Sequence, residues 1–207
     1  MALDAAAHAD WLRRQEPAQA WLGRGYGLIA GVDEVGRGPL AGPVVAAAVI
    51  LSPEAYLPGL RDSKQLTALA RQRYYVAIRE QALGIGLGLC SVAEIDRLNI
   101  RQATFLAMRR ALSALPLAPE VVLVDGEAVP ELPFVQENKI GGDDLSNVIA
   151  AASVVAKVVR DRFMVALAGR FPGYELHQNK GYGTAEHRRA IRDLGPCPIH
   201  RRSFRLD

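Results

Sequence analysis

The chain has 207 residues and a mass of 22.4 kDa; half of its residues are apolar and 23% are charged, which excludes global disorder and supplies the core of one domain. The longest apolar run, Val44–Leu51, falls far short of the roughly 20 residues that a transmembrane helix needs. A net charge of +3 and a pI near 9.0 mildly favour a polyanionic partner.

The termini and the cysteines indicate the compartment. Asp4, His8 and Asp10 interrupt the N-terminal segment, so we expect no secretory signal. Two cysteines, Cys90 and Cys197, are too few for a disulfide framework and predict reduced, buried thiols. We therefore expect a soluble cytoplasmic protein with no membrane partner.

The predicted elements mix strands and helices. In chain order the sequence predicts a helix over residues 3–22, strands over 28–32 and 43–51, a helix over 67–83, a strand over 85–92, a helix over 99–115, strands over 121–124 and 133–137, and helices over 144–168 and 184–194. The early strands have little helix between them, which predicts a mixed sheet with helices packed on it. Glycines at 84, 86 and 88 lack dinucleotide-site spacing and predict a strand packed closely by a helix.

Acidic residues stand where predicted buried elements begin or end. The two strand ends carry Asp33, Glu34 and Asp125, and the start of the long helix carries Asp143 and Asp144. Buried carboxylates are costly unless a cation compensates them. Three such placements resemble an all-carboxylate metal site, whose oxygen ligands suit Mg²⁺ or Mn²⁺ and not zinc.

Each acidic placement also has a simpler explanation. The first is a polar turn in which Arg37 pairs with Glu34, and the last is capping of a helix N-terminus by one of the two aspartates. Regular strand geometry would put Asp33 and Glu34 on opposite faces of the sheet, so both reach one site only if the chain leaves that geometry there.

Three further segments are candidates for function, each with a structural alternative. Lys64 in Arg61–Leu66 is a surface residue by default, and small residues 150–153 favour close packing of a helix, with Ser153 not required for catalysis. Lys157, Arg160 and Asp161 follow as expected ion-pair partners. The loop 179–184 places Tyr182 beside Lys180, where they could contact a nucleotide, or where Thr184 simply caps a helix.

Together these segments resemble ribonuclease HII, the bacterial type 2 ribonuclease H. The resemblance runs in order from about residue 27 to 204 and rests on the motifs at 31–44, 62–66, 124–126, 150–161, 180–184 and 200–204. One departure is Gly141-Gly142-Asp143, where family members usually have Lys-Gly-Asp. A cationic contact near Asp143 is therefore expected to be lost or moved to Lys139.

The resemblance implies an α/β, ribonuclease H-like fold: a mixed β-sheet flanked by helices, with a small helical C-terminal region. We expect an N-terminal helical extension over residues 1–25, a catalytic domain over 26–169, and a basic region over 170–207 that completes the substrate groove. That last region contains eight Lys or Arg residues and four acids.

The implied activity is that of a metal-dependent endoribonuclease. It would hydrolyse the RNA strand of RNA–DNA hybrids and nick DNA duplexes on the 5′ side of embedded ribonucleotides, leaving 3′-hydroxyl and 5′-phosphate ends. Two Mg²⁺ or Mn²⁺ ions would be held by four acids: Asp33, Glu34, Asp125 and Asp143. One ion would generate the nucleophile and the other would stabilise the leaving oxygen.

The resemblance also assigns substrate contacts. The turn of Gly36, Arg37 and Gly38 would contact the 2′-hydroxyl. Tyr182 would stack on the neighbouring sugar and also help to sense the 2′-hydroxyl. Lys64, Lys180 and the arginines of the C-terminal segment would hold phosphates without reading sequence. We expect a monomer. The rivals are a polymerase palm, suggested by Gly142-Asp143-Asp144, and a non-catalytic hybrid-binding protein.

Overall fold

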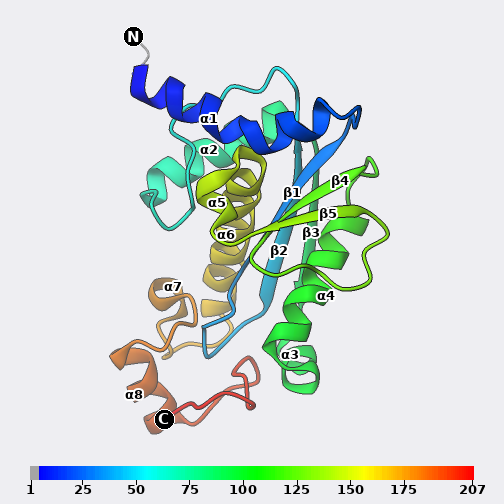
Figure 1. The fold of residues 1–207 in the computed structure, drawn as a ribbon. Helices are drawn as coiled ribbons and strands as arrows, with labels where there is room; N and C mark the ends of the chain where they lie inside the picture. The colour runs from blue at the N-terminus through cyan, green and yellow to red at the C-terminus, as the bar shows by residue number, and fades with distance from the viewer. Residues whose placement is uncertain (1–4) are drawn as a thin grey trace.

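The centre of the fold is a five-stranded mixed sheet, seen in a computed structural model that describes residues 5–207 (Figure 1). The strand order is β3-β2-β1-β4-β5, with β1 paired antiparallel to β2 and parallel to β4. The strands are β1 (Ile29–Val35), β2 (Val44–Leu51), β3 (Ala82–Cys90), β4 (Val121–Asp125) and β5 (Val135–Lys139). The predicted mixed sheet is therefore confirmed.

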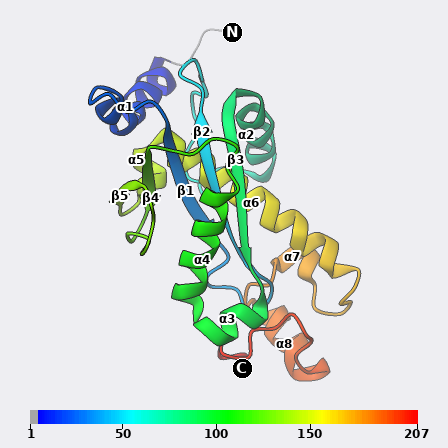
Figure 2. The ribbon, with the colours of Figure 1, turned by 90° about the vertical axis from the view of Figure 1, so that its right-hand side faces the viewer.

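Helices cover both faces of the sheet and both of its ends. They are α1 (Ala5–Leu22), α2 (Ala68–Gln81), α3 (Val92–Leu98), α4 (Ile100–Ser113), α5 (Gly142–Leu145), α6 (Asn147–Ala168), α7 (Leu176–Asn179) and α8 (Ala185–Leu194). Helices α4 and α6 lie on opposite faces, α1 crosses one end, and α7 and α8 lie at the other end with the C-terminus (Figures 1 and 2). Residues 3 and 4 of the predicted first helix lie outside the described residues.

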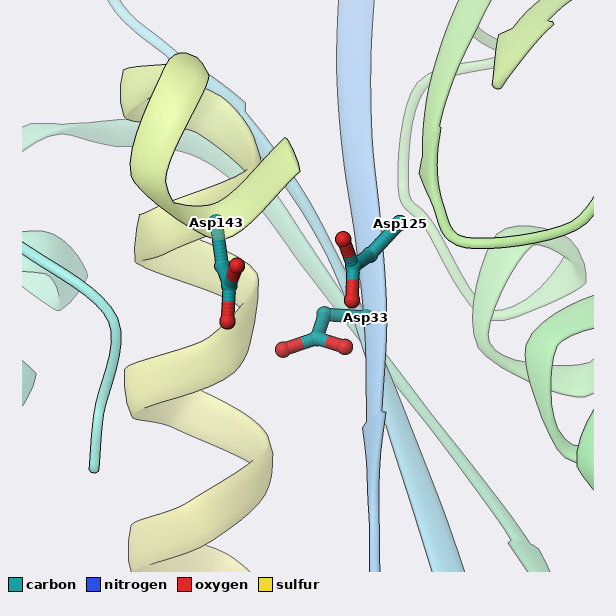
Figure 3. Close-up of side chains that lie close together, drawn as sticks. All are labelled: Asp33, Asp125 and Asp143. Carbon is teal, nitrogen blue, oxygen red and sulfur yellow. The ribbon is translucent and has the colours of Figure 1, made fainter. Parts of the chain in front are cut away.

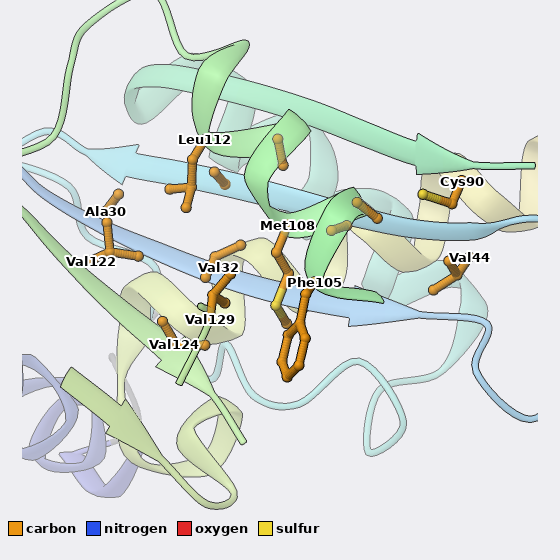
Figure 4. Close-up of a cluster of buried hydrophobic side chains, with 14 of the residues drawn as sticks. Ala30, Val32, Val44, Cys90, Phe105, Met108, Leu112, Val122, Val124 and Val129 are labelled. Atoms are coloured by element: carbon orange, nitrogen blue, oxygen red, sulfur yellow. The ribbon is translucent and has the colours of Figure 1, made fainter. Parts of the chain in front are cut away.

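The first core lies between the sheet and α4. Phe105, Met108 and Leu112 of α4 are buried against apolar side chains of the central strands (Figure 4). The bare face of β3 allows this contact, because a Cβ on Gly86 or Gly88 would lie 2.0 Å from a carbonyl oxygen of α4. The predicted close approach of a helix to this strand is confirmed.

The second core lies on the opposite face, under α6. Residues 150–152 of α6 are fully buried alanines that pack against β2 together with Trp11 of α1. A Cβ on Gly31 in β1 would lie 2.2 Å from the carbonyl carbon of Val148. Small residues on both elements therefore bring the start of α6 directly onto the strand that carries Asp33.

Two element predictions need correction. The strand expected to reach residue 92 ends at Cys90, because Ser91 and Glu94 form a capping box that starts α3. The long helix begins at Asn147 and is preceded by the one-turn helix α5, which contains Asp143 and Asp144. Neither aspartate caps a helix: the N-cap of α5 is Gly141, in the left-handed region at φ 67°.

The cysteines and the helices bear on the compartment. Both cysteines are free; Cys90 is buried as predicted, whereas Cys197 is half-buried. Across residues 5–207, no helix has the combination of length and apolar character that crossing a membrane requires.

Candidate metal centre

Three aspartates from different elements meet at one end of the central strands. One carboxylate oxygen of each of Asp33, Asp125 and Asp143 lies within 4.8 Å of the other two, and the side chains point toward one another (Figure 3). The parallel pairing of Val32 with Val124 explains the first two, because the next residue of each strand emerges at the same edge of the sheet. The third comes from α5.

The backbone of α5 is tied to the end of β4. The Gly142 amide donates to Asp125 Oδ1 at 2.7 Å, and the Gly126 amide donates to the Lys139 carbonyl at 2.9 Å. A Cβ at position 142 would lie 2.6 Å from Ile149 Cδ1, so the turn packs closely on the start of α6. Asp125 therefore helps to place the turn that carries Asp143.

The three carboxylates are packed too closely to be ionised together without compensation. Burial raises the pKa of Asp33 well above its ordinary value, and the charges of Glu34 and Asp125 add to the effect. Burial, with Asp125 and Asp62, raises the pKa of Asp143 to about 7. An all-oxygen donor set of this charge fits a hard divalent cation such as Mg²⁺ or Mn²⁺ and does not suit zinc.

Glu34 lies beside this group but outside it. The strand stays regular through residue 34, which pairs with Ala46, so the departure from strand geometry that would bring Asp33 and Glu34 to one site does not occur. The Glu34 carboxylate lies 3.5 Å from Arg37 Nη1, which confirms the predicted local ion pair. Burial raises the pKa of Glu34 above its ordinary value. The charge of Arg37 lowers this pKa, and the charge of Asp125 raises it further. Among the described residues, the set of converging oxygens contains the three aspartates and not Glu34.

A fourth aspartate, Asp62, borders the cluster and was not predicted from the sequence as a site residue. Asp62 is buried, accepts the Lys64 amide at 3.0 Å, and adds to the raised pKa of Asp143. Ser153 Oγ contacts Ser63 Oγ at 3.0 Å, so its hydroxyl is part of this polar network and does more than fill space. Asp62 begins the motif at residues 62–66, but the neighbouring residues in the sequence do not indicate that its carboxylate is buried.

The ion-pair partner of the Asp143 carboxylate is Lys64, not Lys139. Lys64 Nζ lies 4.0 Å from Asp143 Oδ2 and 3.7 Å from Asp62 Oδ2. The ammonium of Lys139 instead pairs with Glu137 Oε1 at 2.6 Å, so the expected transfer of the cationic contact to Lys139 is wrong. The side chain of Lys64 is 80% exposed and is free to meet an incoming anion.

The turn of Gly36, Arg37 and Gly38 lines the same cleft as the carboxylates of Asp33 and Glu34. This cleft, of about 490 Å³, is also lined by Asp33 and Tyr182. Gly36 adopts φ 94°, in the left-handed region where only glycine is unstrained. The turn therefore presents its backbone to whatever enters beside the aspartates.

Two buried arginines hold this turn and the chain that follows it. Arg201 donates to the carbonyls of Gly36, Arg37 and Gly42, so its predicted role as a phosphate contact is wrong. Burial lowers its pKa to about 9. Arg160, expected in an ion pair, is also buried and donates to the carbonyls of Pro43, Ala41 and Lys180 at 3.0–3.1 Å.

The predicted pair of Lys157 and Asp161 is confirmed, at 2.8 Å. Lys157 also carries its charge to the cleft, because its Nζ lies 5.5 Å from the centre of the Tyr182 ring. That ring is half-exposed, and the Tyr182 carbonyl accepts from His187 Nδ1 at 2.9 Å. Thr184 caps α8, as the structural alternative predicted.

Lys180 lies away from the carboxylates. Its ammonium donates to the His177 carbonyl, and the residue lines a neighbouring groove together with Arg71, Lys157 and Arg162. Tyr182 lines both this groove and the cleft. The two hollows therefore adjoin, with carboxylates in one and mainly cations along the other.

Comparison with known proteins gives the same relationship from sequence and from structure. Residues 30–206 match the family model of ribonuclease HII. The chain is 56% identical over 182 residues to the ribonuclease HII of Syntrophotalea carbinolica, covering 88% of this chain and 87% of the relative. It is 53% identical over 203 residues to that of Moorella thermoacetica, covering 96% and 98%.

Solved structures share the fold. The ribonuclease H2 of Pyrococcus horikoshii superposes with a TM-score of 0.73 at 24% identity, covering 87% of this chain and 95% of that one. The ribonuclease HII solved in complex with PCNA from Archaeoglobus fulgidus gives 0.72 at 26% identity, covering 87% and 96%. The predicted ribonuclease H-like fold is therefore confirmed.

Proposed function

The chain belongs to the ribonuclease HII family and is a ribonuclease H, and from this we propose that it both cleaves the RNA strand of RNA–DNA hybrids and nicks DNA duplexes on the 5′ side of embedded ribonucleotides. The products would carry 3′-hydroxyl and 5′-phosphate ends. The observation that carries the proposal is the convergence of Asp33, Asp125 and Asp143 next to a cleft with a glycine-flanked backbone turn.

The three aspartates would hold the divalent cations on which this family depends, and Glu34 is the fourth candidate ligand. When bound, a pair of Mg²⁺ or Mn²⁺ ions supplies Lewis-acid chemistry that activates water and stabilises the leaving oxygen. Around that centre the protein's own groups bind and orient the substrate. Lys64 is placed to meet a phosphate that approaches Asp143, since it lies 4.0 Å from that carboxylate.

Discrimination of RNA from DNA requires contact with the 2′-hydroxyl. We assign this contact to the backbone of Gly36, Arg37 and Gly38, because the turn lacks side chains at its two glycines and lies in the same cleft as Asp33. The Tyr182 ring, which lines the same cleft, would stack on the neighbouring sugar. Neither contact reads base sequence.

The adjoining groove would bind the phosphate backbone. Arg71, Lys157, Arg162 and Lys180 line it, and phosphate contacts of this kind fix register without sequence specificity. Residues 170–207 contribute Lys180 and Tyr182, which supports their assignment as the region that completes the groove of a catalytic domain over 26–169. We further propose that the protein acts as a cytoplasmic monomer, with both thiols reduced.

A polymerase palm is disfavoured by the position of the second aspartate. Asp144 is exposed and accepts two hydrogen bonds from the Gln65 side chain, at 2.8 and 2.9 Å, so Gly142-Asp143-Asp144 supplies only one carboxylate to the cluster. A non-catalytic binding protein is disfavoured because all the candidate acids are retained.

The proposal is tested with three labelled duplexes: an RNA–DNA hybrid, a DNA duplex with one ribonucleotide, and an all-DNA control. We expect Mg²⁺- or Mn²⁺-dependent cleavage of the first two and none of the third. In the second duplex, a single nick on the 5′ side of the ribonucleotide is expected. An intact single-ribonucleotide duplex beside a degraded hybrid would restrict the activity to hybrids and refute the nicking proposal.

A further inference from the structure

A buried arginine of α1 contacts the turn that carries Asp143. Arg14 is 2% exposed; its Nη2 donates to the Asp143 carbonyl and its Nη1 donates to the Leu60 carbonyl. Helix α1 precedes residue 30, where the family match begins. The expected N-terminal extension is thus in direct contact with the backbone of a candidate metal ligand.

The segment that Arg14 contacts has few other restraints. Helix α5 has only four residues, and such a short helix leaves most of its carbonyls without internal partners. Its further polar ties include the bonds of the Gly142 amide to Asp125, of the Ser146 amide to the Gly142 carbonyl and of the Asp144 amide to the Gly141 carbonyl. The side chains of Asp144 and Asp143 also contact Gln65 and Lys64. A charged donor to the Asp143 carbonyl is therefore a large part of what fixes this turn.

Arg14 also joins α5 to a second segment of the site. Leu60 directly precedes the stretch that contains Asp62 and Lys64, and the Lys64 ammonium approaches the Asp143 carboxylate. One guanidinium thus connects the two segments whose side chains meet at the edge of the acidic cluster. Its rigid fork can hold two carbonyls in a fixed relation, which a lysine ammonium cannot do as well.

The helix that carries Arg14 is itself anchored. Trp11 is buried in the core under α6, and its carbonyl accepts from Asn147 Nδ2 at 2.9 Å. Burial of the guanidinium is costly, and within residues 5–207 its one ion-pair partner is Asp10, at 3.8 Å. The buried guanidinium donates to the carbonyls of Leu60 and Asp143, so it can hold these two segments in place.

We propose that Arg14 is a positioning residue that holds Asp143 within ligand distance of Asp33 and Asp125, so that α1 is part of the metal centre. This inference rests on the proposed role of Asp143 as a metal ligand. Loss of the guanidinium would let α5 shift and would weaken cation binding, without removing any ligand.

The test is calorimetric titration of Mn²⁺ into the full-length protein, with no substrate present. We expect Arg14→Met to weaken Mn²⁺ binding by about tenfold, in line with the loss of other groups that orient metal ligands. Arg14→Lys retains one charged donor and should recover part of the affinity. Asp143→Asn serves as the reference for loss of the ligand itself.

Two control variants separate positioning from general stability. Arg13→Met changes the exposed neighbour on the same helix and should leave Mn²⁺ affinity unchanged. Trp11→Leu weakens the packing of α1 and should lower the melting temperature, with a smaller loss of Mn²⁺ affinity than Arg14→Met, because Arg14 itself is retained. Melting temperatures of all the variants are measured in parallel, without metal.

The outcomes are distinguishable. If Arg14→Met, or Arg14→Lys where the methionine variant does not fold, binds Mn²⁺ within about twofold of wild type while Asp143→Asn has lost it, the inference is overturned and the metal site stands. Equal losses in Trp11→Leu and Arg14→Met would also overturn it, since packing alone would then explain the effect. Unchanged binding by Asp143→Asn would instead refute the ligand role on which the inference rests.

Discussion

Arg201 Nη2 donates to the carbonyl oxygen of Gly36 at 2.6 Å, across 165 residues of chain. The same guanidinium reaches the Arg37 carbonyl with Nη1, at 2.8 Å. The C-terminal segment is thereby joined to the turn that we assign to 2′-hydroxyl recognition. Its basic residues consequently differ in role: a buried one shapes the protein, and exposed ones are available to the substrate.

Replacing Arg201 by methionine should affect both stability and recognition. The buried carbonyls of Gly36 and Gly42 and the part-buried carbonyl of Arg37 lose their donor. An unpaired buried polar group costs about 1–3 kcal/mol. We expect the free energy of unfolding to fall by about 3 kcal/mol or more, measured by urea denaturation. The value of kcat/KM on a single-ribonucleotide duplex should fall as well. The exposed neighbour Arg202→Met is the control, and equal stability of the two variants would contradict this role of Arg201.

Replacing Tyr182 by alanine should impair cleavage at single ribonucleotides. Stacking of an aromatic ring on a base is worth about 1–3 kcal/mol, and we expect the contact with a sugar to lie at the lower end of this range, so kcat/KM should fall by about tenfold. Tyr182→Phe keeps the ring and should retain most of the activity. The measurement is steady-state nicking of the single-ribonucleotide duplex. Wild-type kinetics in the alanine variant would remove Tyr182 from the substrate site.

Metal-free stability should depend on pH through Asp143. Its pKa of about 7 lies above the value of 3.8 for an unperturbed aspartate, so the folded state binds this proton more tightly than the unfolded state. The contribution of this proton to the free energy of unfolding is fully present below pH 3.8, the pKa in the unfolded state. It is lost as the pH rises through about 7. In Asp143→Asn the group stays neutral, so this loss does not occur.

We therefore compare melting temperatures of wild type and Asp143→Asn in a chelator, at about pH 5 and about pH 8. The variant should gain on wild type at the higher pH, and added Mn²⁺ should stabilise wild type more at the higher pH because binding requires the ionised carboxylate. Comparison with the variant cancels the opposing contribution of His200, whose pKa burial lowers to about 4. The same difference between the two proteins at both pH values would argue against a raised pKa of Asp143.

Local patterns were sufficient to predict much of the fold. The alternation of glycine in β3 indicated the helix that packs on it, and the apolar run before Asp125 indicated a buried central strand ending in a carboxylate. The boundary between α5 and α6 was not predictable in the same way. It depends on Gly141 in a left-handed conformation and on a tie from the Gly142 amide to Asp125, which comes from a distant strand.

Site residues were predictable where the residue type itself indicates the chemistry. They were not predictable where their role depends on burial. Three of the four acids proposed as ligands converge, because strand ends and a helix start carry them to one edge of the sheet. The predictions for two arginines were wrong. Arg160 was expected in an ion pair and Arg201 at a phosphate, yet both are buried against backbone carbonyls. Only tertiary contacts reveal that difference, and the same holds for Asp62 and Arg14.

Asp125 has two roles in the metal centre: it supplies a carboxylate to the cluster and it accepts a hydrogen bond from the Gly142 amide. The decisive measurement is the cleavage rate of Asp125→Asn on an RNA–DNA hybrid at saturating Mn²⁺, beside substrate binding by the same protein. We expect the rate to fall by at least about a thousandfold while binding stays close to that of wild type. Turnover at the wild-type rate would show that the three aspartates are not the catalytic centre.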